Sequence, residues 1–135
     1  MASRLFPMLS AADFAASLRF YRDLLGGVEA YRFPQDEPAF VTLRFGDSEL
    51  GIGAMRGGAP LHGQPQRPAT GHRIELCLYV DDVDATLAAA HEHPLLLAPT
   101  DQPWGERIAY IADPDGNLVM LAAPGKDPAM NGQGV

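Results

Sequence analysis

The chain contains an internal repeat, and this repeat limits the folds that the sequence can adopt. Residues 13–18 and 82–87 share the pattern acidic, apolar, any residue, alanine, hydroxyl, leucine, as DFAASL and DVDATL. Farther along, residues 46–50 and 115–119 each place a tight turn before an apolar strand, as GDSEL and DGNLV. Because both matches occur in the same order, the sequence predicts two copies of one sheet-and-helix unit.

The first copy, about residues 4–55, is predicted to place a helix between a first strand over 5–9 and three later strands. Ser10 and Asp13 are candidate N-caps, since their side chains can accept hydrogen bonds from free backbone N–H groups. Apolar residues then recur at spacings of 4, 3 and 4, which predicts one helical stripe of Phe14, Leu18, Tyr21 and Leu25. The pair Gly26–Gly27 is expected to end the helix, and strands are predicted over 29–33, 39–45 and 49–55.

The second copy, about residues 72–124, repeats this order of elements. A strand is predicted over 72–80 and a helix over 82–91, followed by strands near 95–97, 107–112 and 118–122. Residues 56–71 are rich in Gly and Pro and read as a linker, and residues 125–135 as a loose tail. The expected fold is α+β: one domain, 1–135, of two tandem βαβββ modules that form a cupped mixed sheet with the helices outside.

Each predicted strand presents alternate side chains to opposite faces of the sheet. One face of the strand over 72–80 is apolar and suited to cover by a helix, with Ile74, Leu76, Leu78 and Val80. The opposite face carries Glu75, Cys77 and Tyr79. In the strand over 49–55, Gly51 and Gly53 leave the same side bare, which gives room for a flat ligand or a close backbone.

Composition and charge exclude several classes of function. The formal net charge of −7 disfavours nucleic acid, which is bound through clustered Lys and Arg. No stretch reaches the roughly 20 apolar residues that cross a bilayer, and the N-terminus lacks the apolar run of a secretion signal. A single cysteine, Cys77, excludes an intramolecular disulfide. The sequence therefore predicts a cytoplasmic protein that binds neither membrane nor nucleic acid.

Two motifs carry a resemblance to a known superfamily: residues 17–26, SLRFYRDLLG, and residues 113–117, DPDGN. With the repeat, they make the chain, over about residues 4–124, similar to the vicinal oxygen chelate superfamily of glyoxalases, extradiol dioxygenases, fosfomycin-resistance enzymes and bleomycin-resistance proteins. Residues 6–11 (FPMLSA) resemble the N-terminal arm of the bleomycin-resistance proteins. Residues 102–105 (QPWG), together with Arg107, resemble the loop that lies over the drug in those proteins. This likeness implies a homodimer that exchanges N-terminal strands near Pro7 and sequesters a drug unchanged.

Enzymes of the superfamily hold a divalent metal through four strand positions. Carried over by the resemblance, these positions fall on Phe6, Gly51, Glu75 and Met120. Phe6 and Gly51 offer no ligand, and a Met thioether does not suit the hard or borderline cations of these enzymes. We therefore expect no metal and no other cofactor. The segment His91–Glu92–His93 is explained by the preference of cations for a helix C-terminus.

A small-molecule site is expected where several aromatic side chains converge. Trp104, the only tryptophan, lies in a loop and can stack on a flat ligand. Glu75 has two interpretations. In the first, its carboxylate is solvated or paired with Arg44 or Arg107. In the second, it is a buried group that binds a ligand or abstracts a proton. Cys77 reads as a small buried hydrophobe or as a reactive thiol. The predicted ligand-binding residues are Phe6, Met8, Phe40, Thr42, Gly51, Glu75, Cys77, Tyr79, Trp104, Arg107, Tyr110 and Met120.

Three hypotheses for function follow. The first is a metal-free homodimer that sequesters an aromatic or polycyclic antibiotic-like compound and gives its host self-resistance. The second is a glyoxalase- or dioxygenase-type lyase or isomerase, with Glu75 as base or with an unrecognised metal site. The third, a structural or regulatory partner module, explains the fold but leaves the bare inner face without a role.

Overall fold

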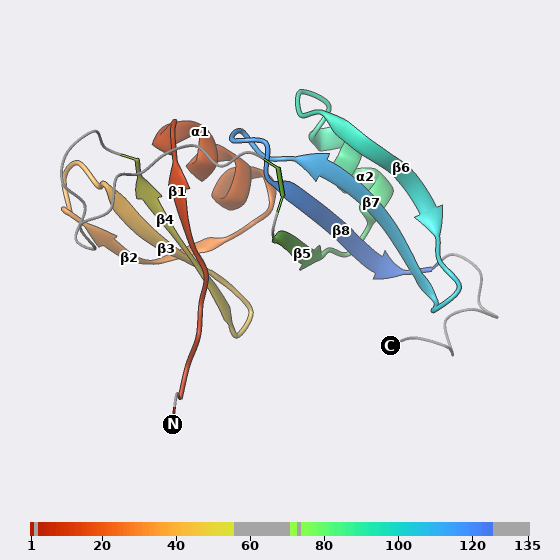
Figure 1. Cartoon of the computed structure of the whole chain (residues 1–135), viewed down its shortest axis with the longest axis horizontal. Coiled ribbons are helices and arrows are strands. Elements are labelled where there is room, and N and C mark those ends of the chain that lie inside the picture. The colour runs from red at the N-terminus through yellow and green to blue at the C-terminus, as the bar shows by residue number, and fades with distance from the viewer. Residues whose placement is uncertain (2, 56–70, 73, 126–135) are drawn as a thin grey trace. The chain divides into compact units, whose positions relative to one another are not determined.

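A computed structural model describes residues 1, 3–55, 71–72 and 74–125 of the chain. The chain divides into two compact units, Met1–Ala69 and Thr70–Val135, and each is described by itself. Almost all of the linker predicted over 56–71 and of the tail over 125–135 lies outside the described residues. Figure 1 shows a sheet with its own helix in each unit.

The first unit contains a four-stranded mixed sheet. Its strands are β1 (Met8–Ala11), β2 (Val28–Phe33), β3 (Phe40–Phe45) and β4 (Ser48–Ala54). They lie in the order β1-β4-β3-β2, with β1 parallel to β4 and the other pairs antiparallel. The helix α1 (Phe14–Leu18) continues directly into a π-helix, η1 (Arg19–Leu24).

The second unit repeats this arrangement. Its strands are β5 (Glu75–Tyr79), β6 (Leu95–Asp101), β7 (Glu106–Ala112) and β8 (Leu118–Pro124), and its helix is α2 (Val83–Ala89). The strand order is β5-β8-β7-β6, again with one parallel pair, β5 and β8. The α+β fold of two βαβββ modules, predicted from the repeat, is confirmed.

Matching residues of the repeat begin both helices. Oδ1 of Asp13 accepts a hydrogen bond of 3.0 Å from the Ala16 backbone, and Oδ1 of Asp82 accepts one of 3.0 Å from Ala85. Both aspartates have extended backbone, as N-caps do. The prediction of Ser10 as an N-cap is wrong, because Ser10 lies in β1, opposite Gly53 of β4.

The first helix differs from the regular α-helix that the apolar stripe predicts. From Arg19 onward it widens into a π-helix, which brings the adjacent Phe20 and Tyr21 both into the core, at 1% and 0% exposure. Their rings meet edge to face, with centroids 4.8 Å apart. Gly26 has a φ of +83° after the last turn, so the predicted helix end is confirmed.

Strand and helix boundaries shift by a few residues from the predicted ones. The first strand begins at Met8 instead of residue 5, because its four residues pair with Gly51–Ala54 of β4. The strand predicted near 95–97 continues to Asp101, with two irregularities in its pairing with β7. The helix predicted over 82–91 ends at Ala89. Within the described part of the chain, no helix is long and apolar enough to cross a membrane.

Much of the core of each unit lies on the helix-covered face of its sheet. In the first unit, the side chains of Val41, Leu43 and Ile52 are fully buried on the face against which α1 packs. In the second unit, α2 packs against the face of β7 and β8 that buries Ala109 and Leu121. We call the opposite face of each sheet its open face, and it holds most of the predicted ligand-binding residues.

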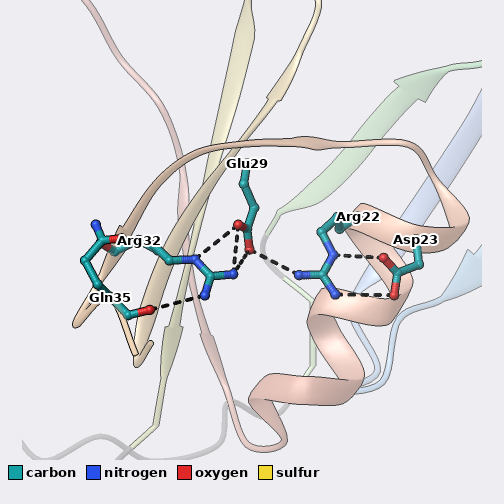
Figure 2. A network of polar contacts seen from close by, with 5 residues as sticks. All are labelled: Arg22, Asp23, Glu29, Arg32 and Gln35. Carbon is teal, nitrogen blue, oxygen red and sulfur yellow. Dashed lines mark hydrogen bonds and ion pairs between the residues drawn. The ribbon is translucent and has the colours of Figure 1, made fainter. Parts of the chain in front are cut away.

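A β-bulge sets which side chains of β2 reach the open face. Register partners are Glu29 with Leu43 and Tyr31 with Thr42, so that Ala30 is the extra residue. The bulge places Glu29 and Arg32 together on the helix-covered face. There Arg32 Nη2 lies 2.8 Å from both carboxylate oxygens of Glu29, and Arg22 Nη1 of η1 lies 3.1 Å from Oε1 (Figure 2).

Candidate functional site

The register of the first sheet places four predicted ligand-binding residues on two adjacent rows of its open face. Residues paired across neighbouring strands point to the same side of a sheet. One row contains Met8, Gly51, Thr42 and Tyr31, and the other contains Ser10, Gly53, Phe40 and Phe33. The structure thus brings Met8, Phe40, Thr42 and Gly51 together.

The protein's own side chains fill the space above the glycines of β4. A Cβ atom on Gly51 would lie 3.1 Å from Cγ of Met8 and 3.1 Å from Cζ of Phe40. A Cβ on Gly53 would lie 3.6 Å from Cδ1 of Phe40. The space expected for a flat ligand or a close backbone is therefore covered by an aromatic ring in this structure. The glycines allow that ring to lie flat against the sheet.

Thr42 occupies the centre of this open face, between Gly51 and Tyr31. It is 4% exposed, and among the described residues its hydroxyl is the buried side-chain polar atom without a hydrogen-bond partner. The surrounding apolar side chains are more exposed, with Met8 at 64%, Tyr31 at 53% and Phe33 at 62%. The face therefore combines accessible apolar surface with one buried polar atom.

Phe6 precedes β1 and is half-buried. The Arg4 guanidinium lies 4.9 Å from the centroid of the Phe6 ring, a cation–π geometry, and 2.6 Å from Oε1 of Glu49. Since Glu49 follows the same alternation along β4 as Gly51, this contact lies on the open-face side of the strand. The N-terminal segment thus contributes both a ring and a charge to this edge of the sheet.

Six of the predicted site residues lie in strands of the second sheet. The register of the sheet places five of them on its open face. Cys77 of β5, Met120 of β8 and Tyr110 of β7 form one row. Glu75 and Leu118 lie in the row on one side, and Tyr79 with Ala122 in the row on the other. The face that was predicted to carry Glu75, Cys77 and Tyr79 is confirmed.

Glu75 is exposed, which agrees with its reading as a solvated or paired carboxylate and not with its reading as a buried group. Its partner is not Arg107, which pairs with Asp84 and Asp101 on the opposite face. Instead, its Oε1 accepts a hydrogen bond of 2.6 Å from the Tyr110 hydroxyl. This hydrogen bond, followed by burial and the charge of Glu75, raises the pKa of Tyr110 to about 12. Tyr110 therefore stays protonated at neutral pH and holds the carboxylate in place.

Glu106, which sequence reasoning missed, is a second carboxylate on this open face. Its Oε1 accepts a hydrogen bond of 2.8 Å from the indole Nε1 of Trp104. A hydrogen bond with Glu106 also raises the pKa of the Tyr79 hydroxyl. Trp104 is half-buried in the turn between β6 and β7, where Glu106 fixes the direction of its ring. The sequence signal that could have indicated Glu106 was its position two residues after Trp104, which lies in a predicted loop.

Cys77 is exposed, so its prediction as a small buried hydrophobe is wrong. Partial desolvation of the thiol raises its pKa, and the negative charges of Glu106 and Glu75 act in the same direction. A thiol with a raised pKa is a weak nucleophile at neutral pH. Cys77 therefore lines the face as a neutral polarisable group.

Arg107 lies apart from the other predicted site residues. It alternates with Glu106 and Ile108 along β7 and points to the face that α2 covers. There its Nε lies 2.8 Å from Asp84 Oδ2 of α2, and its Nη1 lies 3.3 Å from Asp101 Oδ1 of β6. The side chain thus links the helix to the sheet, and we leave it out of the binding face.

The residues that the superfamily resemblance places at metal positions do not fit a divalent cation. Phe6 and Gly51 carry no ligating atom, Met120 offers only a thioether, and Glu75 is a single carboxylate. In the described ranges, no group of three or more His, Cys, Asp or Glu could hold a metal ion. One of the four histidines, His62, lies outside the described residues.

Two further aromatic residues on the open face of the first sheet, Tyr31 and Phe33, were missed. Their strand was predicted, but the bulge at Ala30 reverses the alternation along β2 and so hides which side chains share a face with Thr42. The rings of Tyr31 and Phe40 have centroids 6.4 Å apart. The aromatic surface of this face is therefore larger than predicted.

Comparison with known proteins agrees with this architecture. Residues 6–121 match the Glyoxalase/Bleomycin resistance protein/Dioxygenase superfamily. A lactoylglutathione lyase from Agrobacterium tumefaciens is 27% identical, with a TM-score of 0.63 over 90% of this chain and 94% of that chain. A protein of unknown function from Agrobacterium tumefaciens str. C58 is 25% identical, with a TM-score of 0.72 over 91% and 95%.

A third structure shows the fold alone. A glyoxalase/bleomycin resistance protein/dioxygenase from Nocardioides is 21% identical, with a TM-score of 0.67 over 95% of this chain and 90% of that chain. No curated protein sequence matches the chain. Fold and superfamily are thus supported by matches over nearly the whole chain, and neither fixes an activity.

Proposed function

The chain belongs to the Glyoxalase/Bleomycin resistance protein/Dioxygenase superfamily, and from this premise we propose that it is a small-molecule-binding protein that works without a resident metal. It sequesters an aromatic or polycyclic antibiotic-like compound and so protects its host. One observation carries the proposal. The four positions that the superfamily resemblance implies for metal ligands are Phe6, Gly51, Glu75 and Met120, and they offer a single carboxylate. Gly51, Glu75 and Met120 lie on open faces that carry aromatic side chains.

The open face of the first sheet supports a planar apolar ligand. Two glycines in β4 allow a ring to lie against the backbone, and the Phe40 ring shows that a group of this shape fits there. Met8, Tyr31 and Phe33 add exposed apolar surface in the same rows. Sites for small molecules are mostly apolar with a few polar groups that orient the ligand.

The open face of the second sheet supports stacking and hydrogen bonding to the same class of compound. Tyr79 is 70% exposed, and the Trp104 ring is held by its hydrogen bond to Glu106. Glu75 and Glu106 carry negative charge on this face, and the whole chain has a net charge of −7. A neutral or cationic compound therefore fits better than an anion.

The proposal includes a homodimer in which the N-terminal strands are exchanged. β1 lies at the edge of its sheet and pairs in parallel with β4, so a β1 from a second copy could make the same hydrogen bonds. Light scattering coupled to size exclusion measures the dimer. A cross-link between Cys residues introduced at Ser10 and Gly53, which are register partners, tests whether the strand comes from the partner. A monomer at micromolar concentration would remove this part of the proposal.

The binding experiment uses Trp104, the only tryptophan of the chain, as its reporter. The full chain is titrated with bleomycin, mitomycin C, an enediyne and a polycyclic aromatic antibiotic while Trp fluorescence is recorded. We expect a saturable change for one compound and protection of cells that express the protein. Arg107→Lys is the control, because this side chain lies on the helix-covered face and its replacement should leave affinity unchanged.

Two results would overturn the proposal. The first is the absence of binding and of cellular protection across the panel. The second is a stoichiometric divalent ion, found by elemental analysis, together with turnover that a chelator removes. Turnover without metal that Glu75→Gln abolishes would favour an isomerase or lyase with Glu75 as base instead.

A further inference from the structure

The unpartnered hydroxyl of Thr42 is unusual for the interior of a protein. Buried polar side-chain atoms nearly always have a hydrogen-bond partner, because a buried group without one loses its bonds to water and gains nothing. Thr42 is 4% exposed, and its Oγ1 has no partner within the described part of the chain. Valine has the same shape without this cost. Stability alone therefore does not explain the hydroxyl.

The Phe40 ring covers the backbone beside this hydroxyl. Its Cζ and Cε1 atoms lie 3.1 and 3.2 Å from the place of a Cβ on Gly51, the residue opposite Thr42. The other contact at this point is Cγ of Met8, whose side chain is 64% exposed. The Phe40 side chain is only half-buried, and the Tyr31 ring beside it, with centroids 6.4 Å apart, is 53% exposed. The Phe40 ring can therefore rotate away from the two glycines without disturbing the core. A planar ligand that takes its place lies beside Thr42.

We propose that Thr42 is a specificity-determining residue, whose hydroxyl forms a hydrogen bond with a polar atom of an aromatic ligand that lies over Gly51 and Gly53 in place of the Phe40 ring. The polar atom is a ring hydroxyl, a carbonyl oxygen or a ring nitrogen, since a threonine hydroxyl can both donate and accept. This inference rests on the proposed function, because it names the chemistry of the ligand for the same open face.

The geometry explains the roles of three kinds of residue on this face. The glycines provide a flat surface of backbone, Tyr31 and Phe33 provide aromatic neighbours, and Thr42 provides the one buried polar atom. A site that contains a buried hydrogen-bonding group rejects analogues that lack the matching group, because the hydroxyl then stays unpaired. Thr42 thus discriminates between ligands of equal shape.

The experiment uses phenol and toluene as probes, since both have the size of the ring that they replace and only phenol carries a hydroxyl. Binding to the ¹⁵N-labelled full chain is followed through the amide signals of Gly51 and Gly53. For the wild type we expect phenol to bind roughly fivefold more tightly than toluene, the effect of one hydrogen bond. Thr42→Val should remove this preference, and Thr42→Ser should retain it.

A thermal melt of Thr42→Val without ligand separates this role from a structural one. We expect a Tm equal to or above that of the wild type, because the substitution removes an unpaired buried hydroxyl. A lower Tm would show that the hydroxyl already has a partner in the free protein and would overturn the inference. Equal affinities for phenol and toluene, or no change at either glycine amide, would also overturn it.

The outcome is independent of the test of the proposed function. Trp104 reports binding of the antibiotic panel from the second unit, whereas the glycine amides report the first. If a drug binds and Thr42→Val leaves its affinity and the phenol preference unchanged, this inference alone fails. If no drug binds and the phenol preference is present, the proposed function alone fails.

Discussion

The hydroxyl of Tyr110 in β7 donates a hydrogen bond of 2.6 Å to Glu75 in β5, across the intervening strand β8. The two residues are 35 positions apart in the sequence. Three strands must be in register for this contact to form, and Tyr110 lies opposite Met120 while Glu75 lies opposite Leu118. The hydrogen bond therefore depends on the strand pairing of the second sheet, and it joins two polar side chains on the open face of that sheet.

Replacing Glu75 should lower the pKa of Tyr110. In the wild type the carboxylate accepts a hydrogen bond from the neutral phenol and repels the phenolate, so that the pKa is about 12. Glu75→Gln removes the negative charge, and we expect the pKa to move toward the ordinary value near 10. Titration of ¹³Cζ-labelled tyrosine by NMR measures it, with Tyr31→Phe to help assign the signals. An unchanged pKa would contradict the contact.

Asp13 and Asp82 should contribute similar amounts to stability, since they form the same N-cap in the two units. We expect Asp13→Ala and Asp82→Ala each to lower the free energy of unfolding by about 1 kcal/mol. The matched variants Asp13→Asn and Asp82→Asn keep a side-chain acceptor and should retain most of the free energy of unfolding that the Ala variants lose. Urea unfolding followed by circular dichroism measures the effect. Equal losses in the Ala and Asn variants would exclude the cap.

Gly51 and Gly53 should respond differently to alanine. A Cβ at Gly53 makes ordinary contacts, and removing a glycine from a strand interior is favourable by roughly 0.5–1 kcal/mol, so Gly53→Ala should leave stability equal or higher. At Gly51 the new Cβ lies 3.1 Å from both Phe40 and Met8, which must move. We expect Gly51→Ala to be less stable than Gly53→Ala by about 1 kcal/mol in urea unfolding. The reverse order would disprove this packing.

Glu29 should stabilise the first unit at neutral pH and lose this effect in acid. The hydrogen bonds from Arg32, then the charge of Arg32 and the contact with Arg22, hold the pKa of Glu29 below its ordinary value (Figure 2). A lowered pKa in the folded state gives stability that is present above the unfolded pKa of 4.5 and is lost as pH falls through the folded pKa.

The pH dependence is measured on Glu29→Gln. We expect it to be less stable than the wild type at pH 7 by up to about 1 kcal/mol, because the network is partly exposed and screened. The difference should shrink steadily below pH 4.5, as the wild-type carboxylate becomes protonated. Glu37→Gln removes one carboxylate from an exposed position and is the control. A difference between Glu29→Gln and the wild type that is the same at pH 7 and pH 3 would contradict the network.

Most of the fold was predictable because its signals are local. An N-cap such as Asp82, a turn glycine such as Gly116 at a φ of +84°, and alternation along a strand each depend on a few neighbouring residues. The order β1-β4-β3-β2 is not local and was not predicted, since the repeat and the superfamily resemblance indicated two βαβββ modules without the order of their strands. The misplaced Ser10 shows the limit, since it lies in a strand that continues only because β4 offers partners as far as Ala54.

The candidate site was less predictable, since it depends on register and on side-chain packing. The bulge at Ala30 brings Tyr31 into line with Thr42, and no local pattern indicates it. Arg107 was assigned to the site because residues 102–105 and Arg107 resemble the drug loop of the bleomycin-resistance proteins. Alternation along β7 instead sends its side chain to Asp84 on the opposite face. Whether the bare glycines hold a ligand or a side chain of the chain itself depends on the rotamer of Phe40.

The shared strand order of the two sheets separates scaffold from surface. Each sheet completes its own hydrogen-bonding pattern and has a helix-covered face with buried apolar side chains. The open faces built on these two scaffolds differ: one carries glycines beneath a covering ring, and the other a phenol paired with a carboxylate. One arrangement of strands thus presents two chemically different surfaces.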